Sequence, residues 1–369
     1  MKIGILTLQS GYNYGGTLQC LALQNSLISM GHEVSVINYY PVLPVKIPWW
    51  RGWGLSGIKR VDNCRKRFLQ LRYLEDHTAH FDCFKKTHLN LTERCHTPEE
   101  VGEVASKFDA LVVGSDQVWN LKYHPDPTYY LAYPSDFKGL KISYAACCGR
   151  DTGKADDWVA ERLRDFDIIS VRDSFTASWV NAQVEEACPQ IVADPTLLYD
   201  FPDIQKESTR HPDRYIFAYI IGDGCEGFHR RAIAEIKKKY GDMSVVCAIS
   251  TGYRIQLVQW ADKTLYLLDP YEWVEWLANA TFVYTDSFHG VLFSLKNNRN
   301  FIAYYMEAIR SPRLLYLAEQ CGIKERIVDV EKNSLSEALD TKISWEEVES
   351  SMHKLHKHSM NFLSGSLSA

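Results

Sequence analysis

The feature of the sequence that most restricts its fold is an alternation of short apolar segments with amphipathic ones, which runs through the chain twice. At the start, apolar segments at residues 2–8 and 33–39 flank a helix predicted over 16–30, with a glycine-containing turn before the helix. Strands separated by helices are typical of a mainly parallel sheet with helices on both faces. The pattern therefore predicts an α/β fold of the doubly wound, Rossmann-like kind.

The alternation divides the chain into two halves. The first half continues with strands predicted at 110–113, 141–146, 167–171 and 190–193 and helices at 155–165 and 174–182. A polar, proline-containing stretch at 200–213 interrupts it, after which strands are predicted at 215–221, 244–249, 281–285 and 301–305 and helices at 226–240, 270–279 and 288–296. We expect an N-terminal domain over 1–200, a C-terminal domain over 210–330 and a helical tail over 331–369. Two such sheets facing each other would leave a cleft, where ligands bind in this architecture.

Composition excludes several classes of protein. A net charge of −5 does not fit a nucleic-acid-binding domain, which is normally basic. The ten cysteines include no C-x-x-C pair, which argues against a zinc ribbon and against a disulfide framework and favours a reducing cytoplasm. No window approaches about 20 consecutive apolar residues, so no transmembrane helix is predicted. We expect a cytoplasmic protein that binds no metal.

An insertion at residues 41–75 departs from this acidic background. Its stretch 46–72 carries eight basic residues and one acidic residue, interleaved with three tryptophans. Basic residues are attracted to anionic lipids, and tryptophan favours the headgroup region. One prediction is that this stretch contacts the inner face of the membrane peripherally. A solvated or dimer-forming insertion with buried tryptophans is the alternative.

A glycine turn separates the first strand from the first helix. In this turn, Gly15 and Gly16 follow Asn13, so backbone N–H groups can face an anion that the helix dipole also favours. The sequence predicts a ligand contact by these three residues. A tight turn that simply requires glycine explains them equally well.

The segment GSDQVWN, at 114–120, follows the most hydrophobic strand of the first half. Polar residues at such strand ends face the cleft. We therefore predict that Ser115, Asp116, Trp119 and Asn120 bind substrate, with the tryptophan against a sugar face. The alternative is that the first two residues only cap the next segment.

Three further residues lie where later strands end and helices begin. Arg172 is either a fork for phosphate or carboxylate or half of a structural pair with Asp173. His289 lies at a strand-to-helix turn beside serine and glycine, which makes it an acid–base candidate. Arg313 begins a helix, where it either reaches the cleft or is solvated, and because the dipole there disfavours a cation we expect an anionic partner.

Taken in order, five stretches resemble the polysaccharide pyruvyl transferase family. They are NYGGTLQCLALQNSL, GSDQVWN, SVRDSFTASWV, VADPTLLYD and TDSFHGVLFSL, and the series covers residues 1 to about 326. The resemblance implies a two-domain fold of the GT-B type. It also implies transfer of an enolpyruvyl unit from phosphoenolpyruvate, the co-substrate, to a sugar. The product would be a pyruvate ketal on a cell-surface polysaccharide or lipid-linked precursor, with no other cofactor.

The resemblance also implies roles for single residues. In the family, the arginine of the RD stretch and the histidine of the last motif contact the donor, which carries over to Arg172 and His289. Many relatives have an arginine two residues before that histidine, where this sequence has Ser287, which we expect to contact substrate in its place. We expect Arg313 to compensate and to form the donor clamp with Arg172. We assign His289 as the acid and Asp116 as the hydroxyl base.

Two other functions stay open at this point. One is a glycosyltransferase of the same fold that uses a nucleotide sugar, although no acidic pair or basic loop for a diphosphate stands out in the second half. The other is a catalytically silent glycan-binding protein, which the serine at position 287 suggests.

Overall fold

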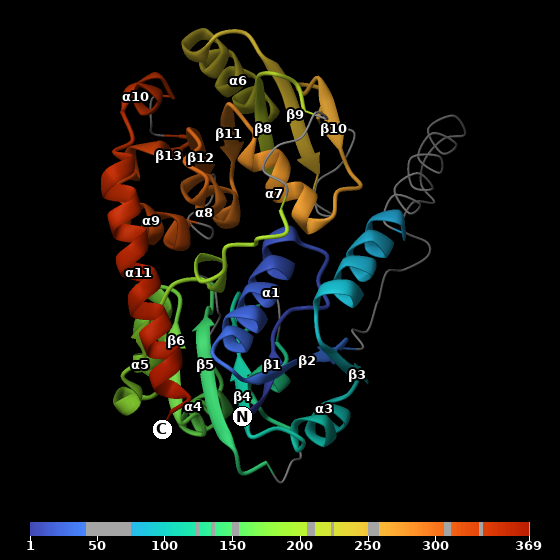
Figure 1. Cartoon of the computed structure of the whole chain (residues 1–369). Coiled ribbons are helices and arrows are strands. Elements are labelled where there is room, and N and C mark those ends of the chain that lie inside the picture. Colours follow the sequence, from blue (N-terminus) through green and yellow to red (C-terminus); the bar gives the residue numbers. More distant parts are fainter. Residues whose placement is uncertain are drawn as a thin grey trace, which may run out of the picture.

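A computed structural model of the chain describes residues 1–41, 75–122, 125–133, 137–149, 155–204, 211–222, 225–249, 258–305, 311–331 and 335–368. The described residues form two separate parallel sheets covered by helices, one above the other in Figure 1. Residues 42–74, which make up nearly all of the insertion predicted at 41–75, lie outside the described residues.

The first sheet has seven strands in the order β3-β2-β1-β4-β5-β6-β7. All six neighbouring pairs are parallel. The strands are β1 Lys2–Leu6, β2 Glu33–Tyr39, β3 Leu91–Cys95, β4 Ala110–Val113, β5 Leu140–Ala146, β6 Ile168–Val171 and β7 Gln190–Ile191. The central strands β1 and β4 are buried almost throughout, as parallel strands covered on both faces must be.

The second sheet has six strands in the order β10-β9-β8-β11-β12-β13, which repeats the order of the first. Its strands are β8 Tyr215–Ile220, β9 Ser244–Ile249, β10 Lys263–Leu265, β11 Phe282–Thr285, β12 Phe301–Tyr305 and β13 Ile327–Asp329. In each sheet the strand order reverses once, between β1 and β4 and between β8 and β11. Ligands in doubly wound folds bind outside the carboxyl ends of the strands at such a switch point.

Helices connect the strands. They are α1 Tyr14–Ser29, α3 Pro98–Ala105, α4 Asp157–Arg164, α5 Ser174–Gln183, α6 Glu226–Tyr240, α7 Pro270–Ala278, α8 Phe288–Lys296, α9 Ser311–Gln320, α10 Leu335–Asp340 and α11 Trp345–Ser366, and residues 75–88 are also helical. Short 3-10 helices lie at η1 Pro127–Tyr130, η2 Glu185–Ala187, η3 Pro195–Leu197 and η5 Lys324–Arg326. Among the helix starts that the sequence predicted, α7 begins with a full capping box.

The two halves are joined by aromatic packing and by the last helix. Tyr14, the first residue of α1, stacks on Trp273 of α7 with ring centroids 5.5 Å apart. The long helix α11 extends from the second sheet along the first in Figure 1, and the hydroxyl of its Ser359 accepts a 2.8 Å hydrogen bond from the backbone N–H of Ala193. The tail is therefore packed against the N-terminal half rather than set apart.

The predicted fold class is confirmed: two doubly wound, Rossmann-like halves in an α/β chain with a C-terminal helix. The strands β3, β10 and β13 and the helix at 75–88 were not predicted, and the expected helical tail over 331–369 consists of two helices, α10 and α11. These strands lie at sheet edges, and β10 and β13 have only three residues each, too few to show an apolar period. The proposed domain limits at 200 and 210 fall between the last strand of one sheet and the first of the other.

Candidate active site

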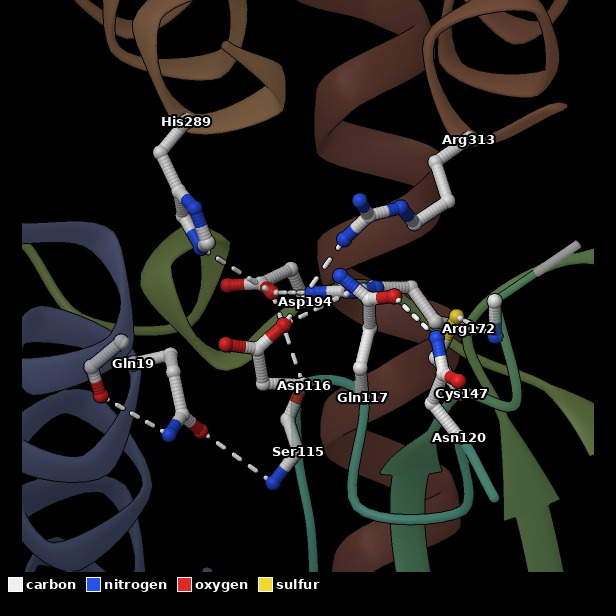
Figure 2. Close-up of polar contacts among 12 residues, drawn as sticks. Gln19, Ser115, Asp116, Gln117, Asn120, Cys147, Arg172, Asp194, His289 and Arg313 are labelled. Atoms are coloured by element: carbon white, nitrogen blue, oxygen red, sulfur yellow. Dashed lines mark hydrogen bonds and ion pairs between the residues drawn. The ribbon is translucent and has the colours of Figure 1, made fainter. Parts of the chain in front are cut away.

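The residues that follow β1, β4, β6 and β7 in the first sheet meet those that follow β11 and β12 in the second. Figure 2 shows His289 and Arg313 descending from the second half toward Asp116, Arg172 and Asp194 of the first half. The cluster thus combines side chains from both halves at the two switch points. This is where the doubly wound architecture places ligands.

The start of α1 is in close contact with the second half. Asn13 caps the helix, because its side-chain oxygen accepts a 3.1 Å hydrogen bond from the N–H of Gly16. A Cβ added at Gly15 would overlap the ring of His289, and one added at Gly16 would lie 3.6 Å from a carboxylate oxygen of Asp116. Glycine at position 15 therefore lets the helix start approach His289, whereas a side chain at position 16 would make only an ordinary van der Waals contact. Ligand contact by Asn13, Gly15 and Gly16 stays a prediction.

A shared side-chain amide connects this helix to the strand β4. Gln19 of α1 donates from its amide nitrogen to the hydroxyl of Thr7 at 3.0 Å and to the carbonyl of Gly16 at 2.9 Å. Its amide oxygen accepts from the backbone N–H of Ser115 at 3.1 Å. All four residues are buried, so the amide fixes the loop after β4 against the first turn of α1.

Asp194 lies at the centre of the cluster and is fully buried. Its Oδ2 accepts from Nη1 of Arg172 at 2.8 Å and from the hydroxyl of Ser115 at 3.4 Å, and lies 3.5 Å from Nε2 of His289. Its Oδ1 accepts from the N–H of Thr196 at 3.0 Å and from its hydroxyl at 2.7 Å. Burial alone would raise the pKa of Asp194, but these cations and donors hold it far below its usual range.

A second carboxylate, that of Asp116, is in contact with two arginines. Nη2 of Arg172 donates to its Oδ1 at 3.3 Å, and Nη1 of Arg313 lies 3.7 Å from the same oxygen. Burial would raise the pKa of Asp116, but Arg172, His289 and Arg313 together lower it. Its backbone is left-handed, with φ of 68°, a conformation that non-glycine residues adopt mostly where function or the surrounding structure requires it.

Arg172 and Arg313 differ in their exposure and in the number of carboxylates that each one contacts. The side chain of Arg172 is 2% exposed, and both of its terminal nitrogens are bonded to carboxylates. That of Arg313 is 17% exposed, and its contact with Asp116 is the one polar partner it has among the residues described. Arg313 is therefore the more available of the two cations for an incoming anion.

The alternative pairing considered for Arg172 is not the one observed. Asp173 accepts a 2.7 Å hydrogen bond from the N–H of Thr176 and so caps α5. The guanidinium of Arg172 turns instead to Asp194 and Asp116. Ser287 likewise acts as a helix cap, since its hydroxyl accepts from the N–H of Gly290 at 3.3 Å at the start of α8.

The prediction that Trp119 offers a face to a sugar does not agree with the structure. Trp119 is fully buried, stacks on Tyr130 with centroids 5.7 Å apart and donates from its ring nitrogen to the carbonyl of Tyr129 at 3.2 Å. It belongs to the core below the loop, because every part of the ring is already in contact. Asn120 is also buried, and its amide binds the side chain of Gln117 at 2.8 Å.

Asp194 was not predicted as a site residue, although it lies in VADPTLLYD, one of the stretches that resemble the family. The available signal was its position directly after the strand predicted at 190–193, where Asp116 and Arg172 also stand relative to their strands.

Within the described part of the chain, no group of three or more His, Cys, Asp or Glu side chains could hold a metal ion, and no helix is long and apolar enough to cross a membrane.

Comparisons with known proteins identify the family of the chain. The family model described as polysaccharide pyruvyl transferase matches residues 13–307, which include every member of the cluster except Arg313. A search of curated proteins found no match.

Solved structures show the fold. A protein of Listeria monocytogenes assigned as a UDP-N-acetylglucosamine 2-epimerase has a TM-score of 0.53 at 13% identity, covering 98% of this chain and 94% of its own. UGT89C1 of Arabidopsis thaliana, solved with quercetin, has a TM-score of 0.53 at 13% identity, with 99% and 98% covered. MnaA of S. aureus, solved with UDP, has a TM-score of 0.52 at 12% identity, with 98% and 96% covered. At these identities the likeness concerns the GT-B-like fold alone.

Proposed function

The chain belongs to the polysaccharide pyruvyl transferase family, and we propose that it transfers the pyruvyl unit of phosphoenolpyruvate to a sugar. Two sugar hydroxyls replace the phosphate at C2 of the donor, and the methylene carbon becomes a methyl group. Of the two hydroxyl protons, one ends on that carbon and the other on the departing phosphate. The observation that supports this best is the cluster of Arg172, Arg313 and His289 around the buried carboxylate of Asp194 and the partly exposed one of Asp116, where the halves meet.

The donor is an anion with a phosphate and a carboxylate, so it requires at least one arginine. Arg313 is partly exposed and holds Asp116 only at 3.7 Å, and it supplies the first contact. Arg172 keeps its 2.8 Å bond to Asp194 and exchanges its longer bond to Asp116 for a donor oxygen. The start of α1 adds a helix dipole on the same side.

His289 is the proton donor to the methylene carbon. The carboxylate of Asp194, 3.5 Å from Nε2, orients the ring and balances the charge of an imidazolium. Gly15 leaves room for the ring against the start of α1. The carbon at C2 becomes cationic when the methylene is protonated, and the nearby carboxylate of Asp116 stabilises that charge.

Asp116 is the base for a sugar hydroxyl, and donor binding activates it. In the free protein the surrounding cations lower the pKa of Asp116, which makes it a weak base. An anionic donor on Arg172 and Arg313 neutralises two of those cations and removes the bond from Arg172. The pKa of the carboxyl then rises, so the base gains strength only when the donor is in place.

The acceptor is a sugar of a cell-surface polysaccharide or of a lipid-linked precursor. A lipid-linked acceptor would explain the basic, tryptophan-containing stretch at 46–72, through which the protein would meet the inner face of the membrane. Co-sedimentation with anionic vesicles that is lost at high salt tests this part of the proposal, and absence of binding at low salt would refute it.

Isothermal titration calorimetry tests the choice of donor. The protein is titrated with phosphoenolpyruvate and, separately, with UDP-sugars and free UDP. Binding of phosphoenolpyruvate that is weakened in Arg313→Lys supports the proposal. Binding of a UDP-sugar without any binding of phosphoenolpyruvate would favour a nucleotide-sugar glycosyltransferase instead.

A further inference from the structure

A chain of side-chain amides next to the cluster fixes the orientation of Gln117. The backbone N–H of Lys122 donates to the amide oxygen of Asn120 at 3.2 Å, so the amide nitrogen of Asn120 must face the other way. That nitrogen donates to Oε1 of Gln117 at 2.8 Å. The orientation of Gln117 is thus set by a backbone group that can only donate, and its own Nε2 is left to point away from Asn120.

The loop after β5 holds this pair in place. Gly149 has φ of 69°, and a Cβ there would overlap the amide nitrogen of Asn120 and lie 2.9 Å from Oε1 of Gln117. The two amides are therefore packed directly against a backbone that allows no side chain. Asn120 is 2% exposed, and this contact leaves it little freedom to turn.

Nε2 of Gln117 is aimed into the cluster. Gln117 is only partly buried, and Nε2 has no hydrogen-bond partner in the described part of the chain. The residue directly follows Asp116, whose carboxylate lies 3.7 Å from Arg313. In Figure 2 its side chain rises beside Asp116 with the amide nitrogen toward the level of Arg313. In this view the neutral donor of Gln117 and the partly exposed cation of Arg313 both stand on the Asp116 side of the cluster.

We propose that Gln117 binds the anionic donor: its Nε2 donates a hydrogen bond to a phosphate or carboxylate oxygen that Arg313 also contacts. Asn120 and Gly149 are positioning residues that keep the nitrogen, rather than the oxygen, toward that anion. The proposal rests on the proposed function of the cluster. It goes further by adding a neutral donor whose orientation suits an oxyanion, because an oxyanion can only accept and needs the amide nitrogen, whereas a sugar hydroxyl could bind either end of the amide.

The first test is Gln117→Glu. The glutamate can still accept from Asn120, but it places a carboxylate oxygen where Nε2 was. We expect phosphoenolpyruvate to bind at least about tenfold more weakly by calorimetry, because a hydrogen bond to a charged group is lost and repulsion replaces it. The acceptor KM should stay within about twofold of the wild-type value. The exposed Gln190→Glu carries the same charge change and should bind like the wild type. Unchanged donor affinity in Gln117→Glu would overturn the proposal.

The second test is Asn120→Asp, which leaves residue 117 unaltered. An aspartate can accept from the N–H of Lys122 but cannot donate to Gln117, so the Gln117 amide turns its nitrogen inward and its oxygen toward the anion. We expect weaker donor binding with an unfolding midpoint close to that of the wild type. Equal donor affinity would show that the orientation of Gln117 is irrelevant.

Titration with inorganic phosphate separates this inference from the proposed function. If wild-type protein fails to bind phosphoenolpyruvate, the proposed function fails, whatever Gln117 does. In that case, weaker phosphate binding by Gln117→Glu than by the wild type still supports an oxyanion contact at Gln117. Equal binding of phosphate by both proteins, or binding by neither, overturns it.

Discussion

Gly15 and His289 lie so close together that a Cβ at position 15 would overlap the imidazole ring. One residue belongs to the first turn of α1 and the other to the first turn of α8, so the contact joins the two halves of the molecule at their switch points. Nε2 of the same ring lies 3.5 Å from Oδ2 of Asp194. The position of the histidine is therefore fixed from both sides by the N-terminal half.

Replacing Gly15 with alanine should displace His289 or separate the halves. Extra atoms in a well-packed site typically cost about 1–3 kcal/mol, and a displaced histidine should lower turnover at least about tenfold. Urea denaturation and steady-state kinetics measure the two effects. Gly365→Ala is the control, because its Cβ would meet nothing within 4 Å in α11. Wild-type turnover and stability in Gly15→Ala would contradict the close contact.

Asp116→Asn should separate catalysis from donor binding. The variant lacks the base, so turnover should fall by about 10²–10⁴-fold. It also lacks the negative charge that competes for Arg172 and Arg313, so phosphoenolpyruvate should bind as tightly as to the wild type or more tightly. Calorimetry and initial rates give the two quantities. A loss of donor affinity as large as the loss of turnover would show that Asp116 is needed to build the donor site rather than to act as a base.

Lysine in place of each arginine should have different effects. Arg172→Lys breaks the contacts of a buried arginine with two carboxylates, so the free energy of unfolding should fall by a few kcal/mol. The binding of both substrates should also become weaker. Arg313→Lys should raise the donor KM with little change in stability, because that arginine is partly exposed and its ion pair is long. The same stability loss in both variants would mean that both arginines are structural.

The acid sensitivity of the fold should depend on Asp194. Its pKa lies far below the ordinary carboxyl value in the folded protein, so below about pH 4 the unfolded chain takes up a proton that the folded one does not. The stabilisation is therefore present above about pH 4 and is lost as the pH falls further. Urea denaturation at a series of pH values should show that, at acid pH, the free energy of unfolding falls more steeply for the wild type than for Asp194→Asn. Parallel curves would rule this contribution out.

The sequence predicted the fold better than the details of the site. Buried parallel strands such as β4 appear in the sequence as continuous apolar runs. The position of a site at the ends of such strands can therefore be predicted without knowing any three-dimensional contact. The position of Asp194 after a strand could indicate that it lies at the site, but its role depends on Arg172 and His289, which approach it only in three dimensions. For Trp119 the polar neighbours were misleading, because the indole is fully buried and packs against Tyr130 in the core.

Mass spectrometry of glycan products tests the central claim most directly. Candidate lipid-linked glycans are incubated with the protein and either phosphoenolpyruvate or a nucleotide sugar, and His289→Ala serves as the inactive control. The account predicts a mass increase of one pyruvate ketal, with release of inorganic phosphate, only for the wild type with phosphoenolpyruvate. A mass increase of one sugar residue from the nucleotide sugar, with none from phosphoenolpyruvate, would contradict it.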